Sequence, residues 1–300
     1  MGTVGQTYKK RAALTAAVLA LALLTGCAQS VDPIERLGRK AAQRVGSHGP
    51  SGTGRSASHG GQPASHGGRP ASHRGRPAYR RWGLAGPLRP APQPPARPPA
   101  ARTAGPALPP VVRRVRTADK VVFLTYDDGA ERDPRFVDLV RELRLPVSMF
   151  LTDSVVGPGY GHFARLQAVG ASIQNHTLDH PALRGLPYAG QRAEICGQQE
   201  KLRSRFGQRP RLFRPPYGTY DPTTLRAAAD CGISTVVLWR ASMESGELTY
   251  APGENRLRPG DIVSVASGEW TDPTLRERTV RLLRKIQGRG LTVGRLEDYL

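Results

Sequence analysis

VVFLTYDDGAER, residues 121–132, joins an apolar run to two adjacent carboxylates, Asp127 and Asp128, and a glycine. The run of apolar residues that opens it predicts a buried β-strand. Neighbouring carboxylates repel each other unless a cation or a proton lies between them. The stretch therefore indicates either a solvated turn or a strand end that binds a cation or a proton.

Short apolar runs alternate with longer amphipathic segments through the rest of the chain to residue 300. We expect strands at residues 121–125, 147–151, 172–174, 212–214, 235–238, 262–266 and 291–293, and helices at residues 134–144, 162–169, 189–206, 221–231 and 275–288. This alternation predicts an α/β domain with a parallel sheet, and about seven strands favour a barrel-like closure. In such folds functional side chains gather at the C-terminal ends of strands, where Asp127 and Asp128 lie.

HTLDH, residues 176–180, places His176 and His180 four residues apart, directly after another expected strand. If this piece is helical, both imidazoles lie on one face and are close enough to share a metal. Alone the spacing is a weak signal, because surface histidines explain most instances. Two histidines and one carboxylate nevertheless form a ligand set that suits zinc and related divalent ions.

RPPYG, residues 214–218, follows a third expected strand. Its two prolines stiffen the loop and remove two backbone donors. Arg214 is then a fixed cation that can pair with a carboxylate, and a rigid turn with a surface arginine is the alternative.

Taken together, TYDDG, HTLDH and RPPYG resemble, in order and spacing, three motifs of the polysaccharide deacetylases, which share the chitooligosaccharide deacetylase domain (carbohydrate esterase family 4). The resemblance implies a distorted (β/α) barrel and a metal-dependent N- or O-deacetylase. Its partner would be an acetylated polysaccharide or peptidoglycan. By the same resemblance Asp128, His176 and His180 would hold a divalent metal, zinc in the first place, with cobalt, manganese or nickel as alternatives.

The resemblance also assigns three catalytic residues. Asp127 would be the general base, Arg214 would pair with it, and the backbone N–H of Tyr217 would help to stabilise the oxyanion. These roles agree with amide hydrolysis, which needs an activated water and a place for negative charge on the carbonyl oxygen.

Two further motifs of the family are not found. VVLWRASMESG, residues 236–246, has Arg240 and Ser242 where the family has acidic residues. GDIVSVASGEW, residues 260–270, has Ala266 where the family has the histidine that protonates the leaving amine, and no histidine follows His180 anywhere in the chain. The base and metal residues are thus present, while the general acid and its aspartate partner are missing.

Several interpretations follow from the missing acid, which typically contributes about 10²- to 10⁴-fold. The protein is a slow or altered deacetylase with another acid, such as Glu244 or Glu269, or less favourably His162. Alternatively it hydrolyses an O-acetyl ester, or it is a catalytically impaired domain that binds glycan. Non-haem iron oxygenases also use two histidines and a carboxylate, but they usually have all-β folds, which the alternation of strands and helices opposes.

Residues 1–27 have the pattern of an export signal: a basic run at 9–11, an apolar run at 12–24 too short to span a bilayer, and the sequence LTGC. That ending resembles a bacterial lipobox, which makes Cys27 the expected lipidation site. We therefore expect an exported protein, lipid-anchored on the outer face of the bacterial membrane or in the cell envelope.

Residues 28–117 are rich in Pro, Gly, Ser and Arg, which predicts a disordered spacer before a domain at residues 118–300. Residues 1–120 hold 20 of the 44 Lys and Arg residues but only 3 of the 24 Asp and Glu residues. With an export signal, anionic wall polymer or lipid headgroups are the expected partners of this charge, and nucleic acid is not. We expect the chain to be a monomer.

Cys196 and Cys231 remain when Cys27 is assigned to the anchor, since the chain has three cysteines. Disulfides persist outside the cell, so the two cysteines either pair or remain as two free core thiols. The sequence leaves both alternatives open.

Overall fold

The computed structural model describes residues 76–96, 108–266 and 273–300. The chain divides into two units, Met1–Ala64 and Ser65–Leu300, and every described residue belongs to the second. The expected signal peptide, its Cys27 and much of the expected spacer lie outside the described residues. Within the described ranges, no helix combines the length and the hydropathy that crossing a membrane requires.

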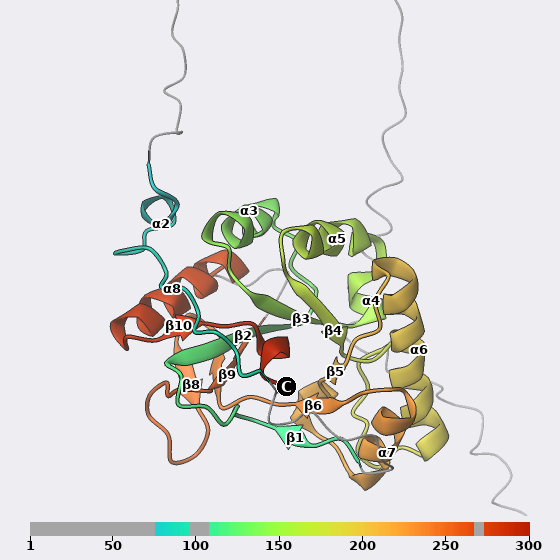
Figure 1. Ribbon diagram of the computed structural model, residues 1–300. Helices are drawn as coiled ribbons and strands as arrows, with labels where there is room; N and C mark the ends of the chain where they lie inside the picture. Colours follow the sequence, from blue (N-terminus) through green and yellow to red (C-terminus); the bar gives the residue numbers. More distant parts are fainter. Residues whose placement is uncertain (1–75, 97–107, 267–272) are drawn as a thin grey trace, which may run out of the picture. The chain divides into compact units, whose positions relative to one another are not determined.

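A single sheet of ten strands forms the centre of the described domain, in the order β1-β6-β5-β4-β3-β2-β9-β7-β8, with β10 paired to β2 (Figure 1). The strands are β1 Val111–Val112, β2 Val121–Asp128, β3 Val147–Leu151, β4 Ser172–Asn175, β5 Leu212–Phe213, β6 Thr235–Val237, β7 Ala241–Met243, β8 Leu248–Tyr250, β9 Ile262–Val265 and β10 Thr292–Val293. All of these strand pairs are parallel except β7 with β8. The predicted α/β class with a barrel-like parallel sheet is confirmed; β1, β7 and β8 are additions to the seven expected strands.

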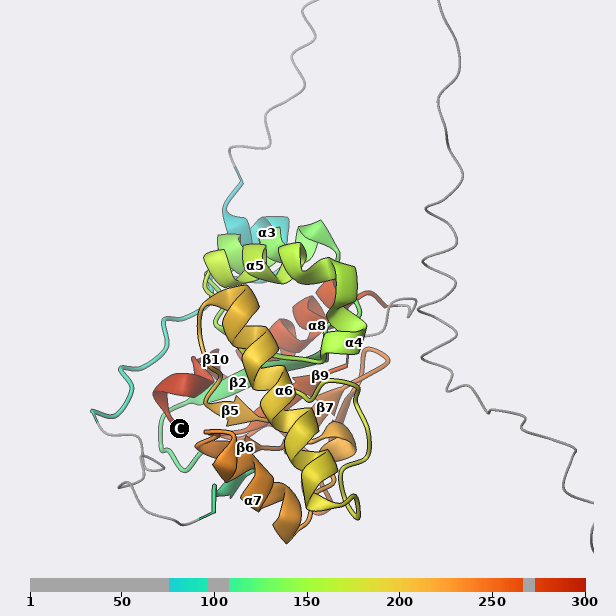
Figure 2. The ribbon, with the colours of Figure 1, turned by 90° about the vertical axis from the view of Figure 1, so that its right-hand side faces the viewer.

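Helices cover the outer side of this curled sheet (Figures 1 and 2). They are α2 Ala78–Arg81, α3 Pro134–Leu143, α4 Asp153–Val156, α5 Tyr160–Ala168, α6 Tyr188–Phe206, α7 Pro222–Asp230 and α8 Leu275–Gly288. Capping boxes begin two of them, with Asp221 and Thr224 at α7 and Thr274 and Glu277 at α8. Each box satisfies backbone donors that a first helical turn leaves without partners.

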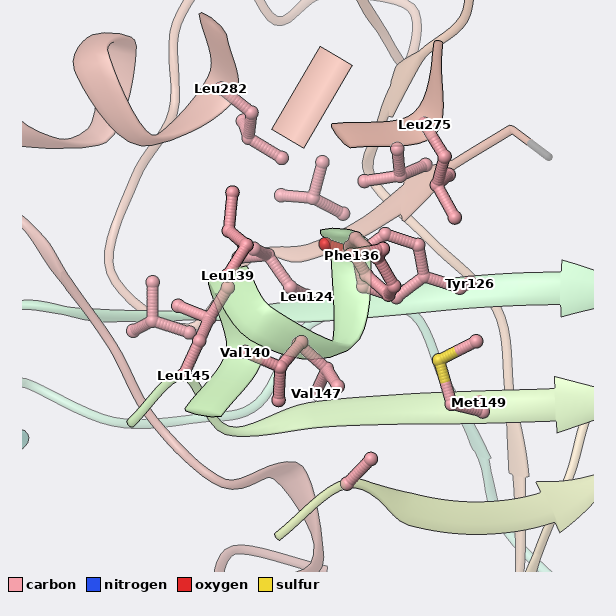
Figure 3. Packing of buried hydrophobic residues seen from close by; sticks show 14 of the residues in the cluster. Leu124, Tyr126, Phe136, Leu139, Val140, Leu145, Val147, Met149, Leu275 and Leu282 are labelled. Atoms are coloured by element: carbon pink, nitrogen blue, oxygen red, sulfur yellow. The ribbon is translucent and has the colours of Figure 1, made fainter. Parts of the chain in front are cut away.

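Strand β2 is buried on both faces. Its side chains alternate between these faces, and this alternation decides the face on which Asp127 lies. Leu124 and Tyr126 pack in the cluster that includes residues of α3 and α8, shown in Figure 3. Val121 and Phe123 belong instead to a second cluster, with residues of β3, β5, β6 and β9. Side chains two residues apart share a face, so Asp127 follows Phe123 on the inner face of the sheet.

Part of the expected spacer is folded, contrary to the prediction of disorder over residues 28–117. Leu84 is buried, and Trp82 packs on the same cluster and donates from Nε1 to Oε2 of Glu142 at 2.7 Å. Strand β1, Val111–Val112, also lies within the expected spacer, and it pairs with β6. Composition averaged over a long stretch conceals a few apolar residues, and those few are enough to order short segments against an existing core.

Cys196 in α6 and Cys231 at the end of α7 form a disulfide, with their Cα atoms 4.9 Å apart. Of the two alternatives that the sequence left open, the structure therefore has the paired one. The bond links α6 to the residue that caps the C-terminus of α7, and the two helices also contact each other.

Candidate active site

The structure brings together the ends of four parallel strands. Asp127 and Asp128 end β2, His176 follows β4, Arg214 follows β5, and Ser264 lies in β9. Carboxyl ends of parallel strands lie at the same edge of a sheet, which is where such folds carry their functional side chains. The three motifs, separated by up to 87 residues in the sequence, thus form one site.

Asp128, His176 and His180 form a candidate metal centre, since each offers one ligand atom and these atoms lie within 4.8 Å of one another. Oδ1 of Asp128 is 3.4 Å from Nε2 of His176 and 3.2 Å from Nε2 of His180. This oxygen is buried and accepts no hydrogen bond from the described residues. A buried carboxylate oxygen without a donor, facing two imidazole nitrogens, fits a divalent cation.

The backbone of the TYDDG motif turns sharply to aim Asp128 at the histidines. Asp128 has φ 65° and Gly129 has φ 88°, both in the left-handed region. A Cβ atom at Gly129 would lie 2.8 Å from Val156 and 2.9 Å from Phe163. Only glycine fits both the backbone angle and the available space. This explains why a glycine follows the two carboxylates.

The HTLDH motif is a loop. The sequence placed both histidines on one face only if this segment were helical, and no helix forms there. Oδ1 of Asn175 accepts from the backbone N–H of Thr177 at 2.9 Å, and the hydroxyl of Thr177 accepts from the N–H of His180 at 3.1 Å. Thr177 and His180 both have positive φ. These turns bring His180 back beside His176, with ring centroids 4.9 Å apart.

Glu194 of α6 holds the same loop from outside, and sequence reasoning missed it. Its Oε2 accepts from the backbone N–H groups of Leu178 and Asp179 at 3.1 and 3.0 Å. A glutamate in a helix carries no local signal for such a contact. Asn175 was also missed, although its position directly before HTLDH made it visible as a turn-forming residue.

Arg214 and Ser264 fix the two oxygens of Asp127. Nη1 of the fully buried Arg214 lies 2.6 Å from Oδ1, and the hydroxyl of Ser264 donates to Oδ2 at 3.0 Å. Nε of Arg214 also donates to the carbonyl of Val237 at 3.2 Å. The carbonyl of Arg214 lies 2.7 Å from Nδ1 of His176, which leaves Nε2 directed at Asp128. One residue thus orients both the aspartate and a histidine.

The electrostatics of the site suit a cation. Burial acts to raise the pKa of Asp127, but the Arg214 cation and hydrogen bonds from Arg214 and Ser264 hold that pKa below its usual value. Burial raises the pKa of Asp128 and lowers the pKa of His176. Asp127 is therefore held ionised and His176 is held neutral, as a metal ligand must be. At Asp128 burial outweighs the favourable charge of Arg214, so an added cation would stabilise its ionised form.

Tyr217 borders the candidate metal centre on its solvent side. It lies within the 3₁₀ turn Pro216–Gly218, has φ 58°, and is 62% exposed. Its ring contacts the ring of His180 edge to face, with centroids 4.7 Å apart. An exposed aromatic ring held this way is available to a ligand.

At the described positions where the family has its acid pair, Arg240, Ser242 and Ala266 offer no carboxylic acid or imidazole. Arg240 pairs with Glu254 at 2.5 Å, and the hydroxyl of Ser242 donates to Glu244 at 3.0 Å. Ala266 directly follows β9, and its backbone N–H donates to the carbonyl of Met243. Glu269, considered as a substitute acid, lies outside the described residues.

His162 lies in α5, as expected for a scaffold residue, and is not among the three candidate ligands. It is buried, and neither ring nitrogen has a hydrogen-bond partner in the described residues. Burial, together with Arg165 and Arg132, lowers the pKa of His162 to about 4. The ring is therefore neutral near pH 7, which speaks against a role as general acid.

The curled, mostly parallel α/β sheet is the fold that the three motifs implied, and the structure brings the side chains of those motifs together. The family described as polysaccharide deacetylase matches residues 114–236, a range that includes TYDDG, HTLDH and RPPYG. The chain belongs to this family, whose hydrolases remove acetyl groups from polysaccharides.

The chain is similar to known proteins in sequence and, separately, in fold. An uncharacterized protein of Streptomyces coelicolor is 68% identical over 197 residues, covering 65% of this chain and 79% of that protein. A chitooligosaccharide deacetylase of Bradyrhizobium is 29% identical over 194 residues, covering 57% of this chain and 87% of that one. The fold is similar to that of a carbohydrate esterase family 4 pseudoenzyme from Bacillus anthracis, with TM-score 0.53 and 19% identity over 65% of this chain and 69% of that one.

Proposed function

We propose that the protein is a metal-dependent deacetylase of an acetylated cell-wall or extracellular glycan. The observation that supports this most directly is the Asp128-His176-His180 centre beside an aspartate fixed by Arg214. These three side chains would hold the metal, with zinc as the first choice. When bound, a divalent metal supplies a Lewis acid that polarises the acetyl carbonyl and lowers the pKa of a water molecule.

The chain's own residues carry the remaining steps. Asp127, ionised beside Arg214, takes a proton from the attacking water while the oxygen of that water bonds to the acetyl carbon. The backbone N–H of Tyr217 donates to the carbonyl oxygen as negative charge develops there. The bond from the acetyl carbon to the sugar nitrogen or oxygen then breaks, and that leaving atom must gain a proton.

Because the leaving atom needs this proton, an O-acetyl group is an easier substrate for this chain than an N-acetyl group. An alkoxide leaving from an ester needs less help than an amine leaving from an amide, and neither Ser242 nor Ala266 replaces the family's acid pair. Chitooligosaccharide deacetylase and peptidoglycan-N-acetylmuramic acid deacetylase are among the named relatives, so N-acetyl substrates belong in the same test.

Acetate release tests this function. The zinc- or cobalt-loaded protein is incubated with N-acetylglucosamine oligomers, peptidoglycan and O-acetylated xylan, and free acetate is measured. Release that disappears in Asp127→Asn and His176→Ala variants is the expected result. Absence of acetate from every substrate contradicts the proposal.

Glycan binding without turnover is the second candidate function, and the residues at positions 242 and 266 favour it. The pseudoenzyme from Bacillus anthracis shows that this fold occurs without activity, and a mutant of that protein has restored enzymatic activity. Retained glycan binding in the absence of acetate release would favour this candidate.

Export through residues 1–27 with lipidation at Cys27 is part of the proposal, as are a monomeric state and a basic spacer near anionic wall polymer. The basic run, the apolar run and LTGC support the anchor. Metabolic labelling with a radioactive fatty acid tests it: wild type should be labelled and Cys27→Ser should not.

A further inference from the structure

A pocket of about 260 Å³ lies where the two ends of the sheet approach each other. Its lining includes Arg113, which directly follows β1, and Thr249 and Tyr250 of β8. Strands β1 and β8 stand at opposite ends of the strand order. In a fully closed barrel every strand pairs with two neighbours, so this pocket exists because the sheet stays open there.

The pocket adjoins the candidate metal centre through Tyr217. This ring contacts His180 at 4.7 Å and also lines the pocket. Trp239, another lining residue, packs under Arg214, whose guanidinium lies 5.3 Å from the indole centroid. A glycan whose acetyl group lies at the metal centre therefore has its neighbouring unit or substituent within reach of this space.

The lining combines positive charge with aromatic surface. Among the described residues, Arg113 and Arg240 are its charged members, and no aspartate or glutamate of this part of the chain lines it. Tyr217, Trp239 and Tyr250 supply aromatic surface on which a sugar ring can pack. Guanidinium groups bind carboxylate and phosphate oxygens with paired hydrogen bonds. The volume lies just below the range of about 300–1,000 Å³ typical of small-molecule sites, which suits one sugar unit or substituent.

Arg240 is held in place by a carboxylate that does not line the pocket. Its Nη2 lies 2.5 Å from Oε1 of Glu254, while its buried Nε has no hydrogen-bond partner among the described residues. Glu254 is shared with Arg114 at 3.3 Å and with Arg258 at 2.8 Å, and Arg114 also pairs with Asp261. Three arginines, Arg114, Arg240 and Arg258, thus share two carboxylates, so this network has a net positive charge.

We propose that this pocket binds a negatively charged group of the glycan, a carboxylate or a phosphate, on the unit next to the acetylated sugar. The statement that this unit lies next to the acetylated sugar rests on the proposed deacetylase function. The pocket's preference for an anion is measured by binding, so its failure is distinguishable from a lack of acetate release.

Calorimetry with the full chain tests the proposal using two pairs of charged and neutral probes, matched in length. These are peptidoglycan glycan strands, whose alternate sugars carry a lactyl carboxylate, the same strands as methyl esters, and a phosphate-bearing wall polymer beside its dephosphorylated form. Arg113→Gln and Arg240→Gln test the pocket. Arg135→Gln, an exposed arginine of α3 outside the pocket lining, is the charge-matched control.

Wild type and Arg135→Gln should bind an anionic probe about tenfold more tightly than its neutral counterpart, as expected for one charge-assisted contact. Arg113→Gln and Arg240→Gln should bring that ratio close to one, and the probe that shows the loss identifies carboxylate or phosphate. Thermal unfolding confirms that Arg240→Gln is folded. A preference that survives in both pocket variants assigns it to the basic N-terminal segment and overturns the proposal, as does an equal affinity of wild type for charged and neutral probes.

Discussion

Ser264 donates a hydrogen bond to Oδ2 of Asp127 at 3.0 Å, across 137 residues of sequence. The register between β7 and β9 places Ser264 opposite Ser242. Ala266 lies two residues further on, and therefore on the same face of the sheet as Ser264. The aspartate proposed as base and the two positions that lack the family's acid pair thus share one face at the end of the sheet.

Ser264→Ala should lower the rate of acetate release about fivefold while leaving KM unchanged. The substitution removes one of the two contacts that fix Asp127 and leaves the Arg214 pair intact, and a hydrogen bond of this kind contributes about 1 kcal/mol. Steady-state kinetics of the metal-loaded protein measure both parameters. Ser264→Thr keeps the hydroxyl and should retain activity; a rate for Ser264→Ala equal to wild type would show that Arg214 alone fixes the base.

Zinc should raise the melting temperature of the wild-type protein by about 5 to 10 °C at a concentration 100 times its Kd, because a ligand that binds only the folded state stabilises it. His180→Ala should abolish the shift, since it removes one of the three candidate ligands. His162→Ala is the control, because it removes a buried histidine outside the metal centre, and it should keep the shift. An unchanged shift in His180→Ala would contradict the assigned ligand set.

The strands and motifs near the site could be predicted from sequence because local patterns specify them. Apolar runs between turn residues located all seven expected strands, and three motifs at strand ends located the Asp127 and Asp128 edge. Parallel strands bring their carboxyl ends together, so motif order alone places Arg214 near Asp127. The 2.6 Å contact between them agrees with that expectation.

Contacts that depend on tertiary structure could not be predicted. Ser264 lies in an ordinary apolar strand, and its bond to Asp127 depends on the β2–β9 pairing. Glu194 reaches the HTLDH loop from a helix. Strands β7 and β8 are three residues each and carry too little pattern to be recognised. Leu84 is buried although its surroundings have the composition of a linker.

Asp221→Ala should lower the free energy of unfolding by about 1 kcal/mol at neutral pH, the usual contribution of a helix N-cap. Asp221 accepts from the backbone N–H groups of Thr224 at 2.8 Å and Gly185 at 2.9 Å. Burial acts to raise its pKa, but these hydrogen bonds prevail and lower the pKa of Asp221 from 3.8 to about 2.

The sign of the pH dependence follows from that lowered pKa. A carboxylate with a depressed pKa in the folded state stabilises the fold above its unfolded pKa, and this contribution is lost as the pH falls through the folded pKa. The difference between wild type and Asp221→Ala should therefore be constant down to about pH 4 and shrink toward about pH 2. Urea unfolding at several pH values measures it. Asp221→Asn keeps a capping oxygen without the titration, and a difference that stays constant to the lowest pH would contradict the assigned role.

Ala266→His combined with Ser242→Asp should accelerate release of acetate from N-acetylglucosamine oligomers by about 10²-fold, the lower range for a general acid. The two positions share a face on neighbouring strands, so the new aspartate can orient the new histidine, and Ala266→His alone should gain less. Ala266→Gln is the matched control, because glutamine resembles histidine in size but donates no proton by titration. Single-turnover acetate release measures each variant. Equal rates for the double variant and the glutamine control would show that a missing acid does not limit this site, whereas a large gain would show that the residues at positions 242 and 266 limit the rate.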